Sequence, residues 1–143
     1  MSTQNPVILV AHDFSPAASC ALAWAVEEAG LRKAEVHLVH VVEYRLSDLF
    51  GDAPPLDEVR IAAVEAAAER RLAELHVPGL VHRHVAIGRP AHRIVELADR
   101  LGPTLLVVGT RGLSGLQGMV IGSVADHVVR HASCAVVCVK APS

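Results

Sequence analysis

Aromatic residues are scarce in this chain of 143 residues, where phenylalanine, tryptophan and tyrosine together make up 3%. Hydrophobic residues still account for 52% of the chain, so its core must be built from alanine, valine, leucine and isoleucine. This composition excludes an intrinsically disordered chain, which has too little apolar surface to bury. The length predicts a single domain, residues 1–143, that is large enough for a real core.

Other absences narrow the classes of partner. No apolar run approaches the roughly 18 residues that a membrane-spanning helix needs, so no membrane partner is expected. The net charge of -2 lacks the basic excess that is typical of nucleic-acid-binding domains. The three cysteines are an odd number without a C-x-x-C pair, and the first six residues do not resemble a secretory signal. We therefore expect a reduced, cytoplasmic protein without nucleic-acid partners.

Short apolar runs alternate with helical patterns along the whole chain. Ser15 is the expected N-cap of the first helix, with Pro16 at its first position and Gly30 as its C-cap. Strands are expected at Val7 to Ala11, Glu35 to Val42, Leu80 to Ala86, Thr104 to Val108 and Ala135 to Val139. Helices are expected at Ala17 to Ala29, at Asp57 to His76, from Gly88-Arg89-Pro90 to about Arg100, and at Ser123 to His131. This alternation predicts an α/β fold, a single doubly wound five-stranded parallel sheet with helices on both faces.

The connection from Gly109 to Gly122 is unusually rich in glycine and reads G-T-R-G-L-S-G-L-Q-G-M-V-I-G. It ends at Ser123, where a helix is expected to begin, and the free N–H groups and dipole of a helix start favour an anion. Neither G-x-x-x-x-G-K-[ST] nor a G-x-G-x-x-G after the first strand is present. The sequence therefore predicts a phosphate site of another kind than a P-loop or a standard dinucleotide-binding domain.

A second connection with unusual chemistry is His12-Asp13, directly after the first strand. In open α/β sheets, ligands bind beyond the carboxyl ends of the strands, where the strand order reverses. A strand order of 3-2-1-4-5 would bring this connection and the glycine-rich one to the same crevice. The carboxylate of Asp13 would then hold ribose hydroxyls or an adenine edge, and the glycine-rich connection would hold phosphates.

The spacing of these glycines matches a known pattern. Gly109, Gly112, Gly122 and Ser123 satisfy G-x2-G-x9-G-[ST]. Further matching segments are V-I-L-V-A-H-D-F-S near the start, L-V-H-V-V at 38–42, G-R-P at 88–90 and G-S-V-A-D-H-V-V-R-H-A from 122. Along its whole length the chain resembles the universal stress protein family, and this resemblance also implies the strand order 3-2-1-4-5.

The resemblance implies a stress-response module that binds ATP or another adenine nucleotide, with or without Mg²⁺, and that binds rather than turns over its ligand. It also implies a homodimer that pairs through the last strand, Ala135 to Val139. The candidate binding residues are Ala11, His12, Asp13, Val41, Gly109, Arg111, Gly112, Gly115, Gly122, Ser123 and Val124. Ala11, Asp13 and Val41 would lie near adenine and ribose, and the glycines, Ser123 and Val124 near ribose and phosphates. Gln117 stands where many members carry Lys or Arg, and Arg111 can supply the positive charge instead.

Simpler structural roles compete with several of these assignments. Asp13 and Ser123 are also typical residues of a helix start. His127 and His131 have the i, i+4 spacing of some zinc sites, and His82 and His84 are two apart on a strand face. Neither pair has an evident third ligand, so these histidines are interpreted as structural or solvent-exposed and no metal site is expected.

Three alternative functions remain at the level of the sequence. The first is a slow ATPase or phosphotransferase, with Ser123 or His12 near the γ-phosphate. The second is a receiver-like signalling domain, which would require a carboxylate paired with Asp13 that the sequence does not provide. The third is a dimerisation module that binds no nucleotide.

Overall fold

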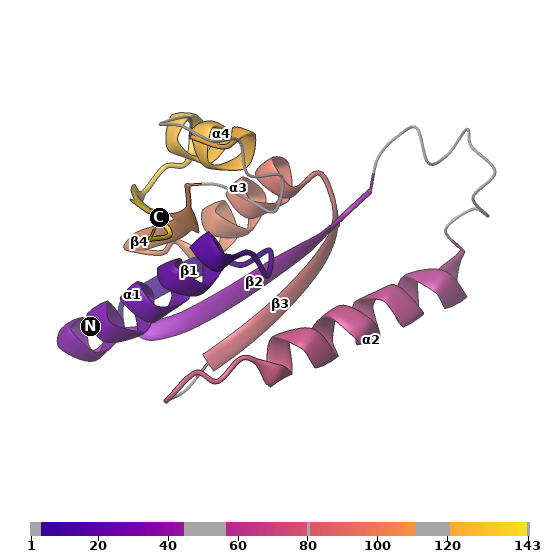
Figure 1. The fold of residues 1–143 in the computed structure, drawn as a ribbon, viewed down its shortest axis with the longest axis horizontal. Coiled ribbons are helices and arrows are strands. Elements are labelled where there is room, and N and C mark those ends of the chain that lie inside the picture. The colour runs from indigo at the N-terminus through magenta and orange to yellow at the C-terminus, as the bar shows by residue number, and fades with distance from the viewer. Residues whose placement is uncertain (1–3, 45–56, 80, 111–120, 143) are drawn as a thin grey trace.

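The computed structural model describes residues 4–44, 57–79, 81–110 and 121–142. Its strands are β1 (Val7–Ala11), β2 (Glu35–Glu43), β3 (Val81–Gly88), β4 (Leu105–Gly109) and β5 (Ala135–Val139). Its helices are α1 (Pro16–Arg32), α2 (Glu58–Glu74), α3 (Pro90–Leu101) and α4 (Ser123–His131). Strands and helices alternate along the chain, as Figure 1 shows. Within the described ranges, none of the helices has the length and hydropathy needed to cross a lipid bilayer.

All five strands pair in parallel in one sheet, in the order β3-β2-β1-β4-β5. This confirms the predicted fold class and strand order. The order reverses between β1 and β4, because the chain first moves outward from β1 to β3 and then returns to the other side of β1. The reversal places the end of β1 beside the end of β4, which is the location where open α/β sheets bind their ligands.

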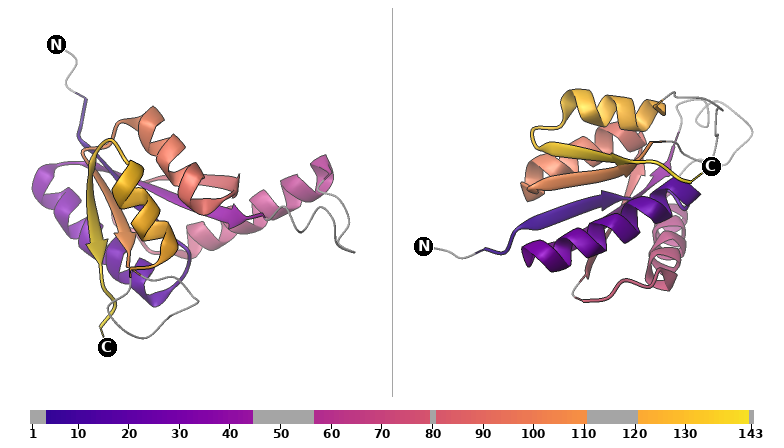
Figure 2. Two further views of the ribbon diagram at one scale, coloured as in Figure 1. Left: turned by 90° about the horizontal axis from the view of Figure 1, so that it is seen from above. Right: turned by 60° about the vertical axis from the view of Figure 1, so that its left-hand side comes forward.

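The sheet is covered on both faces, and the alternation of side chains along each strand divides the core in two. Ile8 and Val10 of β1 belong to the core cluster that contains residues of α1 and α2. Leu9, between them, belongs to the cluster that contains residues of α3 and α4. All three side chains are fully buried. Figure 2 shows the same arrangement, with α1 and α4 on opposite sides of the sheet.

The first helix begins where the sequence predicts but ends later. Ser15 is the N-cap, its hydroxyl accepts the Ala18 N–H at 3.1 Å, and a proline follows in the first turn. The predicted C-cap at Gly30 is wrong, because α1 continues to Arg32 and ends at Lys33. Lys33 adopts the left-handed conformation that ends helices (φ 54), and its N–H donates to the Ala29 carbonyl. A lysine was not an obvious stop signal, because left-handed conformations favour glycine.

The bounds of α2 and of β3 also differ from the prediction. Asp57 is the N-cap of α2 rather than its first residue, and its carboxylate accepts the Arg60 N–H at 2.8 Å. The helix also ends at Glu74 rather than at His76. Strand β3 runs on to Gly88, since its last residues still pair with β2 up to Glu43. The Gly-Arg-Pro sequence was assigned to the start of a helix, although its glycine completes the strand.

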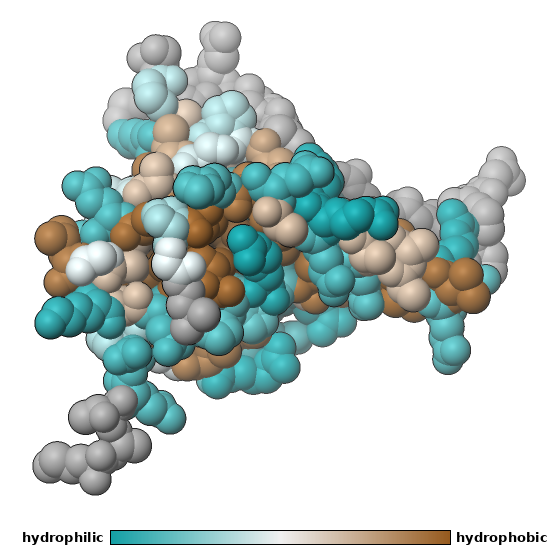
Figure 3. Space-filling model, turned by 90° about the horizontal axis from the view of Figure 1, so that it is seen from below, coloured by the Kyte–Doolittle hydropathy of each residue, from teal (hydrophilic) through white to brown (hydrophobic). Residues whose placement is uncertain are grey.

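Helix α2 covers its side of the sheet only lightly. Ala68 and Leu72 are its buried residues. Val59, near its start, is 77% exposed. Seen from this side, the molecule shows hydrophilic side chains interrupted by hydrophobic ones (Figure 3).

The described cysteines are free thiols. Cys134 and Cys138 pack against the core cluster on the side of α3 and α4. Partial burial raises the pKa of both thiols, which disfavours the reactive thiolate. They therefore serve as small hydrophobic side chains.

Candidate functional site

A cleft of about 1310 Å³ opens at the carboxyl ends of β1, β2 and β4. It is bounded on the other side by the first residues of α3 and α4. The predicted site residues that line this cleft are Ala11, His12, Asp13, Val41, Gly109, Gly122, Ser123 and Val124. The other predicted residues, Arg111, Gly112 and Gly115, lie outside the described residues. The structure thus brings together every candidate that it describes.

Asp13 combines a local structural role with a position at the cleft. Its Oδ1 accepts the Ser15 N–H at 3.0 Å, which fixes the turn from β1 into α1. The residue is exposed and lines the cleft, so the carboxylate also faces solvent there. The structural role and the binding role are therefore compatible for this side chain.

His12 is held in a structural arrangement. It is only 3% exposed, and its Nδ1 accepts the Phe14 N–H at 3.0 Å. The ring proton therefore resides on Nε2, which has no hydrogen-bond partner among the described residues. The ring packs against Phe14, and the Arg71 guanidinium lies over the Phe14 ring, 3.8 Å from its centroid. Burial lowers the pKa of His12 despite the nearby Asp13 carboxylate, so its imidazole is neutral near pH 7.

Gly109 is required by packing as well as by its place at the cleft. A Cβ atom built on it would lie 2.8 Å from the Ala17 carbonyl carbon and 2.9 Å from the Ala17 Cβ. Those atoms belong to the first turn of α1, so glycine lets this helix approach the end of β4. This close approach places the start of α1 directly beside the end of β4.

The start of α4 opens onto the cleft without a side-chain cap. Gly122 is its N-cap and makes no side-chain cap hydrogen bond, so the alternative that Ser123 is the cap is wrong. The Gly122 N–H instead donates to the Thr110 carbonyl at 2.6 Å, which joins the two described ends of the glycine-rich connection. The following N–H groups of the first turn have no acceptor within the helix, so they can donate to an anion in the cleft.

Sequence reasoning assigned no role to the start of α3, which forms a third part of the cleft. Arg89, its N-cap, makes no side-chain cap hydrogen bond and is exposed at the cleft. Gly88 before it has φ 143, and an added Cβ would lie 2.9 Å from the Arg93 Nε. A glycine followed by Arg-Pro directly after a strand was the signal for this feature, because such a turn aims a helix start at the edge where ligands bind.

Two further histidines line the cleft beside Arg89. The ring centroids of His92 in α3 and His127 in α4 lie 4.7 Å apart. His131 lies one turn beyond His127, with ring centroids 4.2 Å apart. Desolvation and then the neighbouring His131, His92 and Arg89 lower the pKa of His127. The sequence pairs His127 with His131 but does not show that His92 of another helix lies beside them.

The cleft therefore has two chemically different walls. A carboxylate from the β1–α1 connection can accept hydrogen bonds from hydroxyl groups. Two helix starts without side-chain caps, together with the Arg89 guanidinium, can donate to an anion. The described lining contains no lysine. Such a cleft is suited to a ligand that carries both hydroxyl and anionic groups.

Comparisons with known proteins agree with this geometry. The family model of the universal stress proteins matches residues 5–140. The chain is 33% identical to universal stress protein A homolog 1 of Coxiella burnetii over 137 residues, which cover 92% of this chain and 94% of that protein. It is 35% identical to universal stress protein YxiE of Bacillus subtilis over 147 residues, covering 93% and 97% of the two chains.

The fold is shared with solved structures as well. That of the protein MJ0577 has a TM-score of 0.74 and 26% identity, covering 96% of this chain and 97% of the other. That of UspA from Lactobacillus plantarum has a TM-score of 0.69 and 26% identity, covering 96% and 99%. The extent of the family match and the identity to full-length relatives lead to one conclusion. The chain belongs to the universal stress protein family.

Proposed function

We propose that the cleft binds an adenine nucleotide, with ATP as the ligand, and that the protein acts as a stress-response module through this binding. The observation that carries the proposal is the pairing of Asp13 on one wall with the uncapped start of α4 on the other. In a nucleotide the ribose, with its hydroxyls, lies between the base and the phosphates. The carboxylate suits the ribose hydroxyls, and the helix start suits the phosphates.

Within this proposal each part of the cleft has a role. Ala11 and Val41 are the apolar residues that contact the adenine, and Asp13 accepts hydrogen bonds from the ribose. The N–H groups of Ser123 and Val124 donate to phosphate oxygens. Gly109, Gly112, Gly115 and Gly122 lie near the ribose and the phosphates. Arg111 supplies positive charge to the phosphates. Mg²⁺, when it accompanies ATP, is bound mainly by the phosphates, as is usual for this ion.

Arg89 extends the proposal beyond the residues that the family pattern suggests. Gln117 leaves the glycine-rich connection without a second basic residue. Arg89 approaches the cleft from α3 and offers a guanidinium, which binds phosphate oxygens in a bidentate way. Its charge lowers the pKa of His127, which lies in α4 and also lines the cleft.

Proteins of the same fold provide additional support. A universal stress protein has been solved in complex with cAMP (TM-score 0.64), and one from Archaeoglobus fulgidus in complex with dAMP (TM-score 0.58). A family protein from Arabidopsis thaliana has been solved with AMP bound (TM-score 0.60). These proteins are 22–24% identical to this chain, so they support the capacity of the fold rather than a particular ligand.

The described lining favours binding over turnover. Hydrolysis requires a group that positions the attacking water and a strong charge clamp on the γ-phosphate. His12, the histidine that the sequence suggests near the γ-phosphate, is buried and packed against Phe14. Incubation with labelled ATP separates the two functions: intact ATP after prolonged incubation supports a binding module, and steady release of phosphate supports a slow ATPase.

The most direct test of the ligand is to denature the purified protein and identify any nucleotide that it releases. Asp13→Asn is the sharpest variant, because the amide oxygen can still accept the Ser15 N–H while the charge is lost. A hydrogen bond to a charged group contributes about 1.5–3 kcal/mol, so we expect ATP affinity to fall about 10- to 100-fold. Asp126→Asn is the matched control, since this carboxylate pairs with Arg130 and does not line the cleft.

Two results would contradict the nucleotide proposal. One is the absence of any released nucleotide together with no thermal shift on addition of ATP, ADP or AMP. The other is equal loss of ATP affinity in Asp13→Asn and Asp126→Asn. The first result makes a dimerisation module without nucleotide the better function. The second shows that the Asp13 carboxylate is not a specific contact of the nucleotide.

We further infer that the protein forms a homodimer through β5. This strand pairs on one side with β4 and is the last strand of the sheet, so its outer edge can pair with another strand. The Val139 carbonyl accepts the Thr110 N–H, so residue 139 directs its polar groups inward. By alternation, residues 136 and 138 direct theirs outward.

This alternation provides a specific test of the dimer. Val136→Pro removes an outward N–H and leaves the pairing with β4 in place, because proline is tolerated where the N–H faces outward from an edge strand. Val136→Ala is the matched control, since it shortens the side chain but keeps the N–H. Sedimentation should show a dimer for the wild type and the alanine variant and a monomer for the proline variant. A monomeric wild type would refute the inference.

A further inference from the structure

A second group of polar side chains lies at the amino ends of β2 and β3, at the edge of the sheet opposite to the cleft. Glu35 is the first residue of β2, and His37 follows two positions later, on the same face of the sheet. His82 of β3 stands directly opposite His37 in the parallel register. None of these three residues lines the cleft.

The register brings three potential metal ligands together. The Glu35 Oε2 lies 3.7 Å from the His37 Nε2 and 3.6 Å from the His82 Nε2. The two imidazole rings are stacked, with centroids 4.4 Å apart and an interplanar angle of 19°. In the described part of the chain, this is the only group whose three ligand atoms all lie within 4.8 Å of one another. Sequence reasoning gave His82 no third ligand, and the structure supplies two from the neighbouring strand.

We propose that Glu35, His37 and His82 form a binding site for a zinc ion. Ligand atoms about 2.0–2.1 Å from a tetrahedral Zn²⁺ are about 3.3–3.5 Å apart, so two of the three separations already approach the bound geometry. Two imidazole nitrogens and one carboxylate oxygen are a donor set that suits zinc, whereas Mg²⁺ and Ca²⁺ prefer oxygen ligands. The fourth position is left to water.

Access to the site is from the side of His82. The His37 side chain is 11% exposed, the Glu35 side chain 31% and the His82 side chain 45%. The buried ligand is therefore fixed by its surroundings, and the exposed one can rotate to complete the site. This gradient also determines the choice of variants, since changes at Glu35 or His82 disturb the core least.

His84 acts on this site as a positioning residue. Its Nε2 lies 2.9 Å from the His37 Nδ1. When the His37 Nε2 binds a metal, the ring proton must be on Nδ1, where it donates to the His84 Nε2. Metal-binding histidines almost always have such a partner for their second nitrogen, because it fixes the tautomer and the ring orientation.

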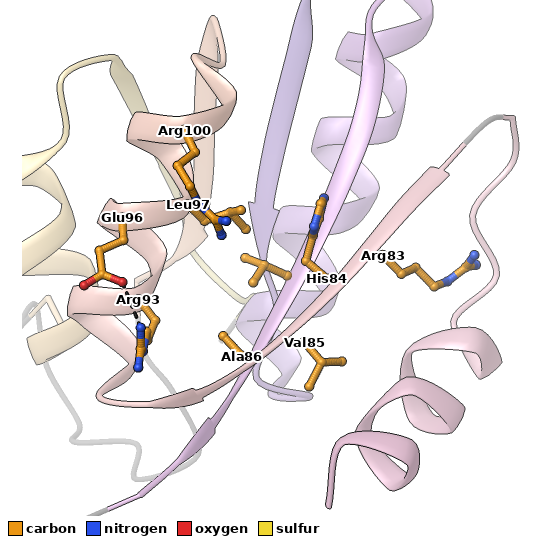
Figure 4. A pocket seen from close by; sticks show the side chains of 9 residues that line it. Arg83, His84, Val85, Ala86, Arg93, Glu96, Leu97 and Arg100 are labelled. Carbon is orange, nitrogen blue, oxygen red and sulfur yellow. Dashed lines mark hydrogen bonds and ion pairs between the residues drawn. The ribbon is translucent and has the colours of Figure 1, made fainter. Parts of the chain in front are cut away.

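His84 is itself held by its surroundings. It lines a cavity of about 310 Å³ together with Leu97 and Arg100 of α3. Figure 4 shows its ring directed toward α3, whereas the adjacent Arg83 points the other way, toward α2. The Arg83 Nε accordingly donates to the Leu72 carbonyl of α2 at 3.3 Å. The alternation of β3 thus keeps the nearest arginine in sequence on the face opposite to the proposed ion.

The test is a titration of the chelator-treated protein with Zn²⁺ in the presence of excess Mg²⁺. The wild type should bind one Zn²⁺ per chain at this site, and Co²⁺ in its place should give the strong visible absorption of a tetrahedral complex. His82→Ala and Glu35→Gln should each weaken binding by about 10-fold or more. His131→Ala is the matched control, because it removes an exposed histidine from the other ring cluster and should leave this affinity unchanged.

The role of His84 requires a readout that a purely structural residue would not change. His84→Ala should weaken Zn²⁺ binding about 10- to 100-fold, while the visible spectrum of the Co²⁺ complex keeps its tetrahedral form. His84→Gln should restore the affinity, since its amide oxygen can accept the His37 Nδ1–H. Circular dichroism of each variant, with the helical signal of the wild type retained, separates loss of a ligand from loss of the fold.

Three results would overturn the proposal. These are a wild type that binds no Zn²⁺, equal affinity in the wild type, His82→Ala and Glu35→Gln, or an equal loss in the His131→Ala control. Because the site lies at the opposite edge of the sheet from the cleft, the Zn²⁺ titration is carried out on the nucleotide-free protein and does not depend on nucleotide binding. Failure of nucleotide binding would therefore leave this test intact.

Discussion

Gly109→Ala is the substitution for which the structure gives the clearest physical expectation. The added Cβ would lie 2.8 Å from the Ala17 carbonyl carbon and 3.0 Å from the Ala18 N. Both atoms belong to the backbone of α1, so the clash cannot be relieved by a side-chain rotation. The helix must move away from β4, and overpacking of this kind costs about 1–3 kcal/mol of stability.

The same substitution at Gly30 provides a control with the opposite sign. Gly30 lies within α1, is exposed, and nothing lies within 4 Å of an added Cβ. Alanine is favoured over glycine in a helix by about 0.5–1 kcal/mol, so Gly30→Ala should be more stable than the wild type. Both variants add a single methyl group, and only the location differs.

The assay is thermal unfolding of the nucleotide-free proteins, because a bound ligand would raise the transition temperature by itself. For a chain of this length, 1 kcal/mol corresponds to a shift of about 3 °C. Gly109→Ala should therefore unfold about 3–10 °C below the wild type, and Gly30→Ala about 2–3 °C above it. If Gly109→Ala proves as stable as Gly30→Ala, the contact between α1 and β4 is not as close as described and the reasoning fails.

Further expectations concern the ends of α1 and the connection before it. Ser15→Ala removes the N-cap acceptor of the buried Ala18 N–H and should lower the free energy of unfolding by about 1 kcal/mol in denaturant titrations. Lys33→Gly relieves a left-handed residue and should raise it by about 1 kcal/mol; a loss of stability would show that the lysine side chain matters more than its backbone. The pKa of His12 in the folded state lies below its ordinary value, so as the pH falls the unfolded chain takes up the proton first and stability falls. In His12→Asn the decline in stability between about pH 7 and pH 5 should be shallower, and an unchanged slope would assign the decline to other groups.

Much of the fold was predictable because it depends on local patterns combined with general rules of topology. The apolar runs of β1 and β4 indicate strands buried on both faces, and alternation with helices then restricts the sheet to parallel pairing. The ends of helices were less predictable where a residue adopts a backbone conformation that is unusual for its type. Lys33 ends a helix in a conformation that favours glycine, whereas Gly30, the expected stop, lies inside the helix. Intrinsic preference therefore does not determine the end of α1 at either position.

Only the part of the candidate cleft between β1 and β4, where the strand order reverses, could be predicted from the sequence. Asp13 and Gly122 follow the two strands between which the order reverses, so topology alone predicts that they meet. Arg89 was missed because its approach depends on the angle of α3, which a strained turn at Gly88 determines. The cluster of Glu35, His37 and His82 was missed for another reason. It depends on the register of β2 against β3, and no short-range pattern encodes the register of two parallel strands joined by a helix.

The two edges of the sheet differ in a way that follows from the fold itself. Each helix runs back against the strands, so helix starts gather at the carboxyl edge and helix ends at the amino edge. The starts of α3 and α4 make the carboxyl edge favourable for anions, which agrees with the cleft between them. The end of α1 at Arg32 and the end of α2 at Glu74 lie just before β2 and β3, so the amino edge carries the negative ends of helix dipoles. A carboxylate and two imidazoles at that edge extend this polarity, so the proposed anion site and the proposed cation site lie at opposite edges of one sheet.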